Sequence, residues 1–186
     1  MLARKIAPLE DVGLLLLRLI TGVTLVVHGF PKLFGGPEKQ PPKVLVRAFG
    51  QNYPQAYEHG SPSGFAEALR QMNVPMPRVS AYLSGMAELF GGLALILGLM
   101  TRFFAPMAAF NMAVAARVAH WQTGFYGPGG YEFPVLLGSA AGTLFFTGPG
   151  ALSLDAAIDA ASNRKERKRG RSFWDRRARR VLRARR

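Results

Sequence analysis

Four long apolar stretches constrain the fold of this 186-residue chain more than any other feature. They cover residues 12–30, 80–100, 103–121 and 133–147. A helix needs roughly 20 apolar residues to cross a bilayer core. The first three stretches reach that length, and Tyr131 and Glu132 extend the fourth. The helices of a soluble four-helix core would show a polar face every turn, and residues 93–100 and 104–116 have none. We therefore predict four membrane-spanning helices.

The connections between the stretches differ in length and composition. Within residues 31–79, one set of apolar side chains recurs at helical spacing: Phe65, Ala68, Leu69 and Met72. This spacing predicts one amphipathic helix, ended by Pro75 and Pro77, that lies at the membrane interface or over the mouth of the bundle. Only Thr101–Arg102 separate the second and third stretches, which predicts a tight antiparallel hairpin. The fold class is thus an all-α, integral-membrane four-helix bundle with an amphipathic helix in its first outer loop.

Basic residues are concentrated at the C-terminal end. From position 164 onward there are 13 of the 24 Lys and Arg residues and only two acidic residues, so this end carries +11 of the net charge of +13. Lys and Arg accumulate in short cytoplasmic segments of membrane proteins. We therefore predict a multi-pass protein of the bacterial inner membrane with both termini in the cytoplasm. Residues 1–158 would form the transmembrane domain and residues 159–186 a polybasic cytoplasmic tail.

The polybasic tail has two interpretations. Each Lys or Arg near an anionic lipid surface contributes about 1 kcal/mol to binding, whereas a free basic arm could bind nucleic acid through its charge. Apolar residues interrupt the basic run at roughly helical spacing, which is typical of an interfacial helix. In a chain with four spans we favour anionic lipid and do not expect nucleic-acid binding. The predicted lipid-binding residues are Arg176, Arg177, Arg179 and Arg180.

A short helix is predicted between the last apolar stretch and the tail. Ser153 is suited to cap its N-terminus, and Asp155 would lie in its first turn, where the helix dipole favours an acidic side chain.

Charged residues inside the predicted spans are functional candidates, because an ionisable side chain is costly to place in a bilayer. Arg18, Glu88 and Arg117 lie in the first, second and third stretches. At 1.5 Å per residue, either arginine comes within reach of the level of Glu88. We predict an ion pair of Glu88 with Arg18 or with Arg117, which serves either the function or the register of the helices.

A second polar group is expected at the outer mouth of the bundle. His28 and His120 end the first and third stretches, Lys32 follows His28 by one turn, and Glu132 opens the fourth stretch. Such a mouth could exchange protons or hold a quinone or another small polar headgroup, since histidine titrates near neutral pH. Two histidines and a carboxylate could also bind a metal, but they come from three elements without a ligand motif, and we predict no metal site. The candidate site comprises Arg18, His28, Lys32, Glu88, Arg117, His120 and Glu132.

The chain contains no cysteine. This excludes disulfides, cysteine-ligated metal or iron–sulfur sites, and redox chemistry on the chain's own thiols. Any redox chemistry that the protein serves must therefore use a quinone, a metal or a partner.

Several short motifs together resemble those of the DoxX family. They are RLITGVTLVVHGFPKLFG at residues 18–35, AELFGGLALILGLMTR at 87–102, YE at 131–132 and TGPGALSLD at 147–155. They occur in the family's order and span about residues 10 to 158, which leaves the basic tail outside the resemblance. The resemblance places the family's polar residues at Arg18, His28, Lys32, Glu88, Arg102, His120 and Glu132.

The resemblance implies a four-helix inner-membrane protein. Family members are described as a subunit of a thiosulfate:quinone oxidoreductase, and as a membrane anchor for a complex with superoxide dismutase and a thiosulfate sulfurtransferase. We therefore expect a membrane subunit or anchor of a quinone-linked oxidoreductase system that serves sulfur metabolism or oxidative stress. A soluble oxidoreductase or sulfurtransferase would be the partner and would carry the redox centre. The alternative is a non-enzymatic membrane scaffold or small-solute permease, and catalysis by the chain itself and homo-oligomer formation stay open.

Overall fold

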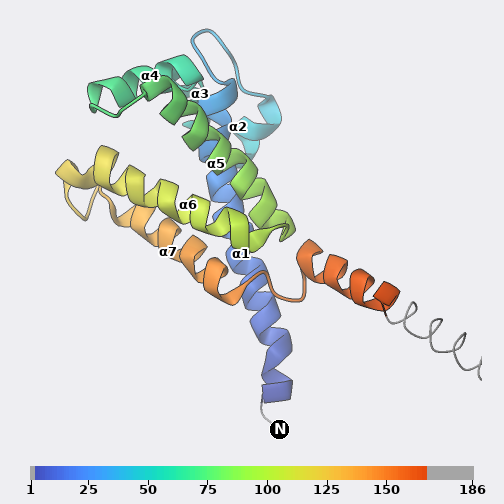
Figure 1. Ribbon diagram of the computed structural model, residues 1–186. Helices are drawn as coiled ribbons and strands as arrows, with labels where there is room; N and C mark the ends of the chain where they lie inside the picture. The colour runs from blue at the N-terminus through green and yellow to red at the C-terminus, as the bar shows by residue number, and fades with distance from the viewer. Residues whose placement is uncertain (1–2, 167–186) are drawn as a thin grey trace, which may run out of the picture.

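The computed structural model describes residues 3–166, and every regular element in that range is helical (Figure 1). The long elements are α1 (Ala3–Phe34), α5 (Pro77–Leu97), α6 (Thr101–Ala115) and α7 (Glu132–Thr147). The short ones are α2 (Lys43–Phe49), α3 (Tyr53–His59), α4 (Pro62–Gln71), a π-helix (Ala116–His120) and a 3-10 turn (Trp121–Thr123). A further helix begins at residue 154 and continues to the end of the described range. The prediction of an all-helical chain is confirmed.

The four long helices coincide with the four apolar stretches of the sequence. Two are long and apolar enough to cross a membrane, α1 over Pro8–Phe34 and α5 over its 21 residues. The helix α7 is apolar but shorter, and α6 continues without a break into the π-helix, so that residues 101–120 form one helical rod. Many large apolar side chains on these helices are exposed, among them Ile20, Phe110 and Phe146. Water disfavours such a surface, and a bilayer accommodates it.

The long helices pack as two pairs, α1 with α5 and α6 with α7 (Figure 1). The first pair is held close by Gly22 and Gly92, because a Cβ atom on either residue would lie 2.6 Å from the carbonyl oxygen of the other. Small residues at such contacts let helix backbones approach each other in membranes. A core of buried apolar residues joins the two pairs: Leu25, Leu95, Ala105, Ala108, Met112, Leu137, Ala141 and Leu144.

The turn between α5 and α6 lies slightly earlier in the chain than predicted. Residues 98–100 make the turn, and Thr101 and Arg102 are the first residues of α6. Gly98 has a φ of 64°, a left-handed conformation that glycine adopts without strain.

The long first connection contains more helix than predicted. The expected amphipathic helix is present as α4, and the Ser61 hydroxyl caps it by accepting from the Gly64 amide at 2.9 Å. This helix ends at Gln71, before the predicted prolines, and Pro77 instead opens α5. The short helices α2 and α3 were missed, because seven residues give too few turns for an apolar period to show.

The chain after α7 returns to the turn between α5 and α6. The predicted cap is confirmed, because the Ser153 hydroxyl accepts from the Ala156 amide at 3.1 Å. The four arginines predicted to bind lipid, Arg176, Arg177, Arg179 and Arg180, lie outside the described residues.

Candidate functional site

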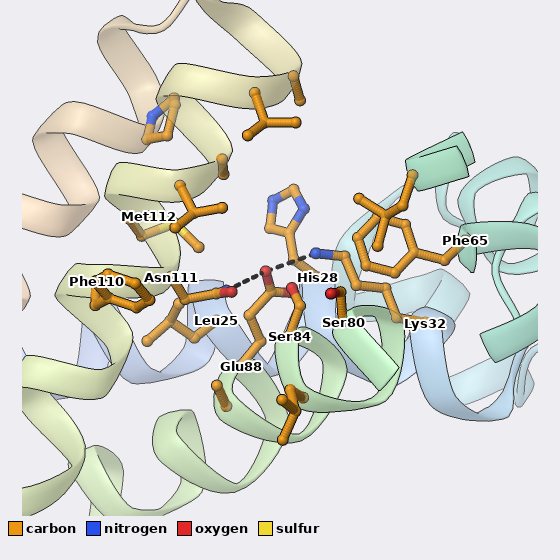
Figure 2. Close-up of a pocket in the computed structure, with 18 of the residues that line it drawn as sticks. Leu25, His28, Lys32, Phe65, Ser80, Ser84, Glu88, Phe110, Asn111 and Met112 are labelled. Carbon is orange, nitrogen blue, oxygen red and sulfur yellow. Dashed lines mark hydrogen bonds and ion pairs between the residues drawn. The ribbon is translucent and has the colours of Figure 1, made fainter. Parts of the chain in front are cut away.

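A cavity of about 650 Å³ lies mainly between α5 and α6, with contributions from α1, α4 and α7 (Figure 2). Cavities of this size, roughly 300–1,000 Å³, are typical of sites for small organic molecules. Most of the lining side chains are apolar. The polar and charged ones are His28, Lys32, Ser80, Ser84, Glu88, Asn111 and His120.

Glu88 is the centre of the polar group in this cavity. Its side chain is only 2% exposed. One carboxylate oxygen, Oε1, accepts from Lys32 Nζ at 2.6 Å and from Asn111 Nδ2 at 2.9 Å (Figure 2). Three helices thus meet at one carboxylate, because Lys32 comes from α1 and Asn111 from α6. A buried carboxylate needs this pairing to offset the cost of removing it from water.

The second oxygen of Glu88 has no such partner. Oε2 is buried, and no other group in residues 3–166 donates a hydrogen bond to it. An ionised carboxylate can accept on both oxygens. The site therefore retains an unused acceptor beside the cavity.

Lys32 links the ion pair to α4. Its Nζ atom lies 4.5 Å from the centre of the Phe65 ring, which is a cation–π contact. Its side chain is 23% exposed, far more than that of Glu88. Glu88 is therefore buried, whereas Lys32 stays partly exposed beside Phe65 of α4.

The two histidines also line the cavity. His28 lies one turn before Lys32 on α1, and its ring packs 5.8 Å from that of Phe133 at the start of α7. The imidazole of His28 lies beside the Lys32–Glu88 pair (Figure 2). His120 Nδ1 donates to the carbonyl oxygen of Gly129 at 2.8 Å, because a carbonyl oxygen can only accept. In the neutral ring this leaves Nε2 of His120 as an acceptor.

The predicted ion pairs of Glu88 with Arg18 or Arg117 are wrong, because Lys32 is its partner. The antiparallel register of α1 and α5 explains the difference. Gly22 packs against Gly92, so Arg18 lies opposite the C-terminal end of α5, and Lys32 is brought to the level of Glu88. The exposed Arg117 instead stacks on Trp121, 5.4 Å from the ring centre.

Glu132 also lies away from the cavity lining. Its Oε1 accepts from the Gly127 amide at 3.4 Å, within the loop between α6 and α7. Of the seven candidates, His28, Lys32, Glu88 and His120 come together around the cavity, whereas Arg18, Arg117 and Glu132 do not. The structure adds Asn111, which the sequence shows as the one amide within its apolar stretch. We call His28, Lys32, Glu88, Asn111 and His120 the cavity cluster.

Arg18 belongs to a separate group at the turn between α5 and α6. Its side chain is fully buried, and its guanidinium donates to the carbonyl oxygens of Leu95 and Ile96, each at 3.5 Å, and to that of Leu152. Asp155 accepts from the amides of Met100 and Thr101 at 2.8 and 3.0 Å.

The carboxylate of Asp155 therefore caps α6, in addition to lying in the first turn of its own helix. Asp11 on α1 accepts from the Ala151 amide at 2.6 Å. We call Arg18, Asp11 and Asp155 the turn cluster, because together they fasten the segment after α7 to α1 and to the turn.

Within residues 3–166, no three His, Asp or Glu side chains gather closely enough to hold a metal ion. In the cavity cluster, Glu88 accepts from Lys32 and Asn111, and His120 donates to a backbone carbonyl oxygen.

Fold and site together define a class: a helical protein with an apolar exterior and a buried carboxylate, paired with a lysine, in a largely apolar cavity. Residues 13–121 match the model of the DoxX family. The chain belongs to the DoxX family and is a membrane protein. The matched range runs from within α1 to just past the π-helix, and therefore includes every residue of the cavity cluster.

One curated relative gives a further comparison. The Bacillus subtilis (strain 168) protein named "Putative oxidoreductase CatD" is 28% identical over 148 residues, which is 80% of this chain and 88% of the relative. No solved structure shows a significant match to the chain.

Proposed function

We propose that this protein is a membrane subunit or anchor of a quinone-linked oxidoreductase system, and that the cavity cluster holds the quinone headgroup. One observation carries the proposal: the buried carboxylate of Glu88, paired with Lys32 and Asn111, lies in a cavity whose remaining lining is largely apolar. The family and the name of the Bacillus subtilis relative support an oxidoreductase context.

The hydrogen-bonding groups of the cluster suit both forms of such a ligand. A quinone has carbonyl oxygens that accept, and Lys32 has three N–H groups, of which Glu88 takes one. A quinol has hydroxyl groups that donate, and Glu88 Oε2 accepts from no group in residues 3–166. The cluster can therefore bind the headgroup before and after reduction.

The electrons must come from elsewhere. Reduction of a quinone to a quinol consumes two electrons and two protons, and the chain has no cysteine to supply or relay electrons through thiols or an iron–sulfur cluster. In this proposal a soluble oxidoreductase or sulfurtransferase supplies the electrons, and this chain holds the quinone and anchors the partner. His28 and His120 are suited to transfer the protons.

We propose that four segments cross the inner membrane: α1, α5, the rod at residues 101–120, and α7. The 20 residues of the rod reach about 30 Å, the thickness of a bilayer core. Both termini would lie in the cytoplasm, where the polybasic tail would bind anionic lipid through Arg176, Arg177, Arg179 and Arg180. The cavity cluster would then lie toward the outer face.

The substitution Glu88→Gln tests the proposal. It keeps the shape of the side chain and an acceptor for Asn111, but it removes the charge that pairs with Lys32. We expect the protein purified in mild detergent to lose its bound quinone, and membranes given a sulfur donor to reduce quinone at least about tenfold more slowly. Glu132→Gln, which makes the same chemical change outside the cavity, is the matched control.

Normal quinone retention and reduction in Glu88→Gln would contradict the proposed site. If wild-type protein retained no quinone but co-purified with a soluble oxidoreductase, the scaffold alternative would replace it. Solute flux in liposomes that Glu88→Gln abolishes and Glu132→Gln leaves unchanged would instead support a permease.

A further inference from the structure

The cavity has an opening between α5 and α6. The two helices meet at the turn of residues 98–100 and diverge toward their other ends (Figure 1). Four lining residues on these helices have strongly exposed side chains, and all four are apolar: Leu83 at 63%, Met107 at 41%, Phe110 at 72% and Val114 at 38%. We call the opening that they border the lateral gap. In a membrane these side chains would contact hydrocarbon, so the lateral gap faces lipid.

Side chains of α1, α7 and α4 cover other parts of the cavity. Leu25 of α1 and Leu137 of α7 are almost fully buried. Phe65 and Leu69 of α4 line the cavity next to Lys32, and the cation–π contact of Phe65 with Lys32 links α4 to α1 there. One way to the polar cluster therefore passes through an apolar opening.

A ligand that uses this opening must satisfy two environments. Beside Glu88 it meets an ammonium group and an unpartnered carboxylate oxygen, which favour hydrogen-bonding atoms. At the lateral gap it meets the apolar side chains that border the opening, which favour hydrocarbon. A small polar solute would satisfy the first environment and not the second.

We infer that the cavity takes its ligand sideways from the bilayer through the lateral gap, and that the ligand is an amphiphile. Its hydrogen-bonding headgroup lies at the Lys32–Glu88 pair, and its hydrocarbon tail lies between α5 and α6 and extends into the lipid. This inference rests on the proposed function for the choice of headgroup. It adds the route of entry and the requirement for a tail.

The test uses the full chain in lipid nanodiscs and two probes with one benzoquinone headgroup. One probe carries an alkyl tail that ends in a photoactivatable diazirine, and the other has no tail. Both concentrations are expressed per lipid, so that simple partition into the membrane does not count as binding. We expect the tailed probe to bind at least about tenfold more tightly, and its tail to label residues 107–114 of α6 and 83–87 of α5 by mass spectrometry.

Two neighbouring positions on α6 give a matched pair of variants. Val114 borders the lateral gap, whereas Ala113 is exposed and does not line the cavity. Val114→Trp should obstruct the gap and lower the labelling at least about fivefold, while Ala113→Trp should leave it within about twofold. Leu83→Trp obstructs the gap from α5 and serves if Val114→Trp does not fold.

The outcomes separate this inference from the proposed function. If the tailless probe binds equally well and competes with the tailed one, or if the label maps to α4 or the loop before α7, lateral entry is wrong and the headgroup site stands. If neither probe binds the wild-type protein, the inference and the proposed headgroup site both fail. Tail-dependent binding that the Trp variants at the gap do not change would also contradict lateral entry.

Discussion

The cavity cluster and the turn cluster both bury charge among apolar helices, but they use it differently. Arg18 is fully buried and directs its terminal amino groups to three backbone carbonyls. Glu88 is 2% exposed and bonds to two side chains, with one oxygen left unpartnered next to a large cavity. Arg18 also has an unpartnered atom, Nε, but it does not line that cavity.

The difference shows how two buried charges in one membrane protein can be told apart. A cation surrounded by backbone carbonyls holds segments of the chain together, and it has nothing to offer a ligand. A carboxylate held by side chains at a cavity costs similar free energy to bury but keeps hydrogen-bonding capacity for a ligand. We therefore assign a structural role to the turn cluster and ligand binding to the cavity cluster.

The largest expected effect is on stability, at Arg18. Arg18→Ala removes the donors to Leu95, Ile96 and Leu152 and leaves a cavity, so we expect a loss of about 4 kcal/mol in the free energy of unfolding. Unfolding in detergent micelles measures this loss. Arg117→Ala removes an exposed arginine at a single cation–π contact and should cost no more than about 1 kcal/mol. Equal losses of unfolding free energy in the two variants would show that Arg18 contributes no more to stability than the exposed Arg117.

A smaller loss in the free energy of unfolding is expected when Asp155 is substituted. Asp155→Ala leaves the amides of Met100 and Thr101 without their acceptor, which should cost about 2 kcal/mol in the same unfolding measurement. Asp155→Asn keeps one acceptor oxygen and should cost about half as much. Quinone binding should be unchanged in both variants. A binding defect without a stability loss would mean that the turn cluster also serves the ligand.

The smallest effect is expected at Tyr53 in α3, another buried polar group without a partner in the described part of the chain. Its hydroxyl makes no hydrogen bond, so Tyr53→Phe should change the free energy of unfolding by no more than about 0.5 kcal/mol at neutral pH. A loss above about 1 kcal/mol would show that the hydroxyl has a partner in the membrane.

Alkaline pH gives an independent check of the same residue. Burial raises the pKa of Tyr53 to about 12, whereas an unfolded chain has a tyrosine pKa of about 10. The folded protein therefore holds this proton more tightly, and the resulting stability is lost as the pH rises from about 10 toward 12. In ultraviolet titration of the phenolates, the absorbance change near pH 12 should be smaller in Tyr53→Phe than in the wild type by that of one tyrosine. An equal change in the two proteins would contradict the assignment.

The sequence was sufficient to predict the long helices and α4, because each has an apolar pattern that extends over several turns. It also predicted four members of the cavity cluster, since charged or titratable residues stand out in apolar stretches. It did not predict the partner of Glu88. The close contact of Gly22 with Gly92 fixes the register of α1 and α5, and counting residues from an assumed membrane boundary does not reveal that contact.

The partners of two other candidate residues, Arg117 and Glu132, were also not predicted from the sequence. Glu132 opens α7, as predicted, but accepts from a loop amide. Arg117 was expected at the level of Glu88, but it lies in the π-helix and stacks on Trp121. Which way a side chain points depends on the helix rotation that packing selects. Asn111 was missed for a different reason, because a neutral amide in an apolar stretch gives a weaker signal than a charge.

The central claim, that Glu88 serves a ligand and Arg18 serves the fold, is tested most directly by measuring quinone affinity and unfolding free energy on the same Glu88→Gln protein. We predict a loss of affinity for the tailed benzoquinone of at least about tenfold. The unfolding free energy should fall by only about 1 kcal/mol, because glutamine still accepts from Asn111 and Lys32 is exposed enough to turn toward the cavity mouth. Unchanged affinity together with a stability loss as large as that of Arg18→Ala would contradict the account.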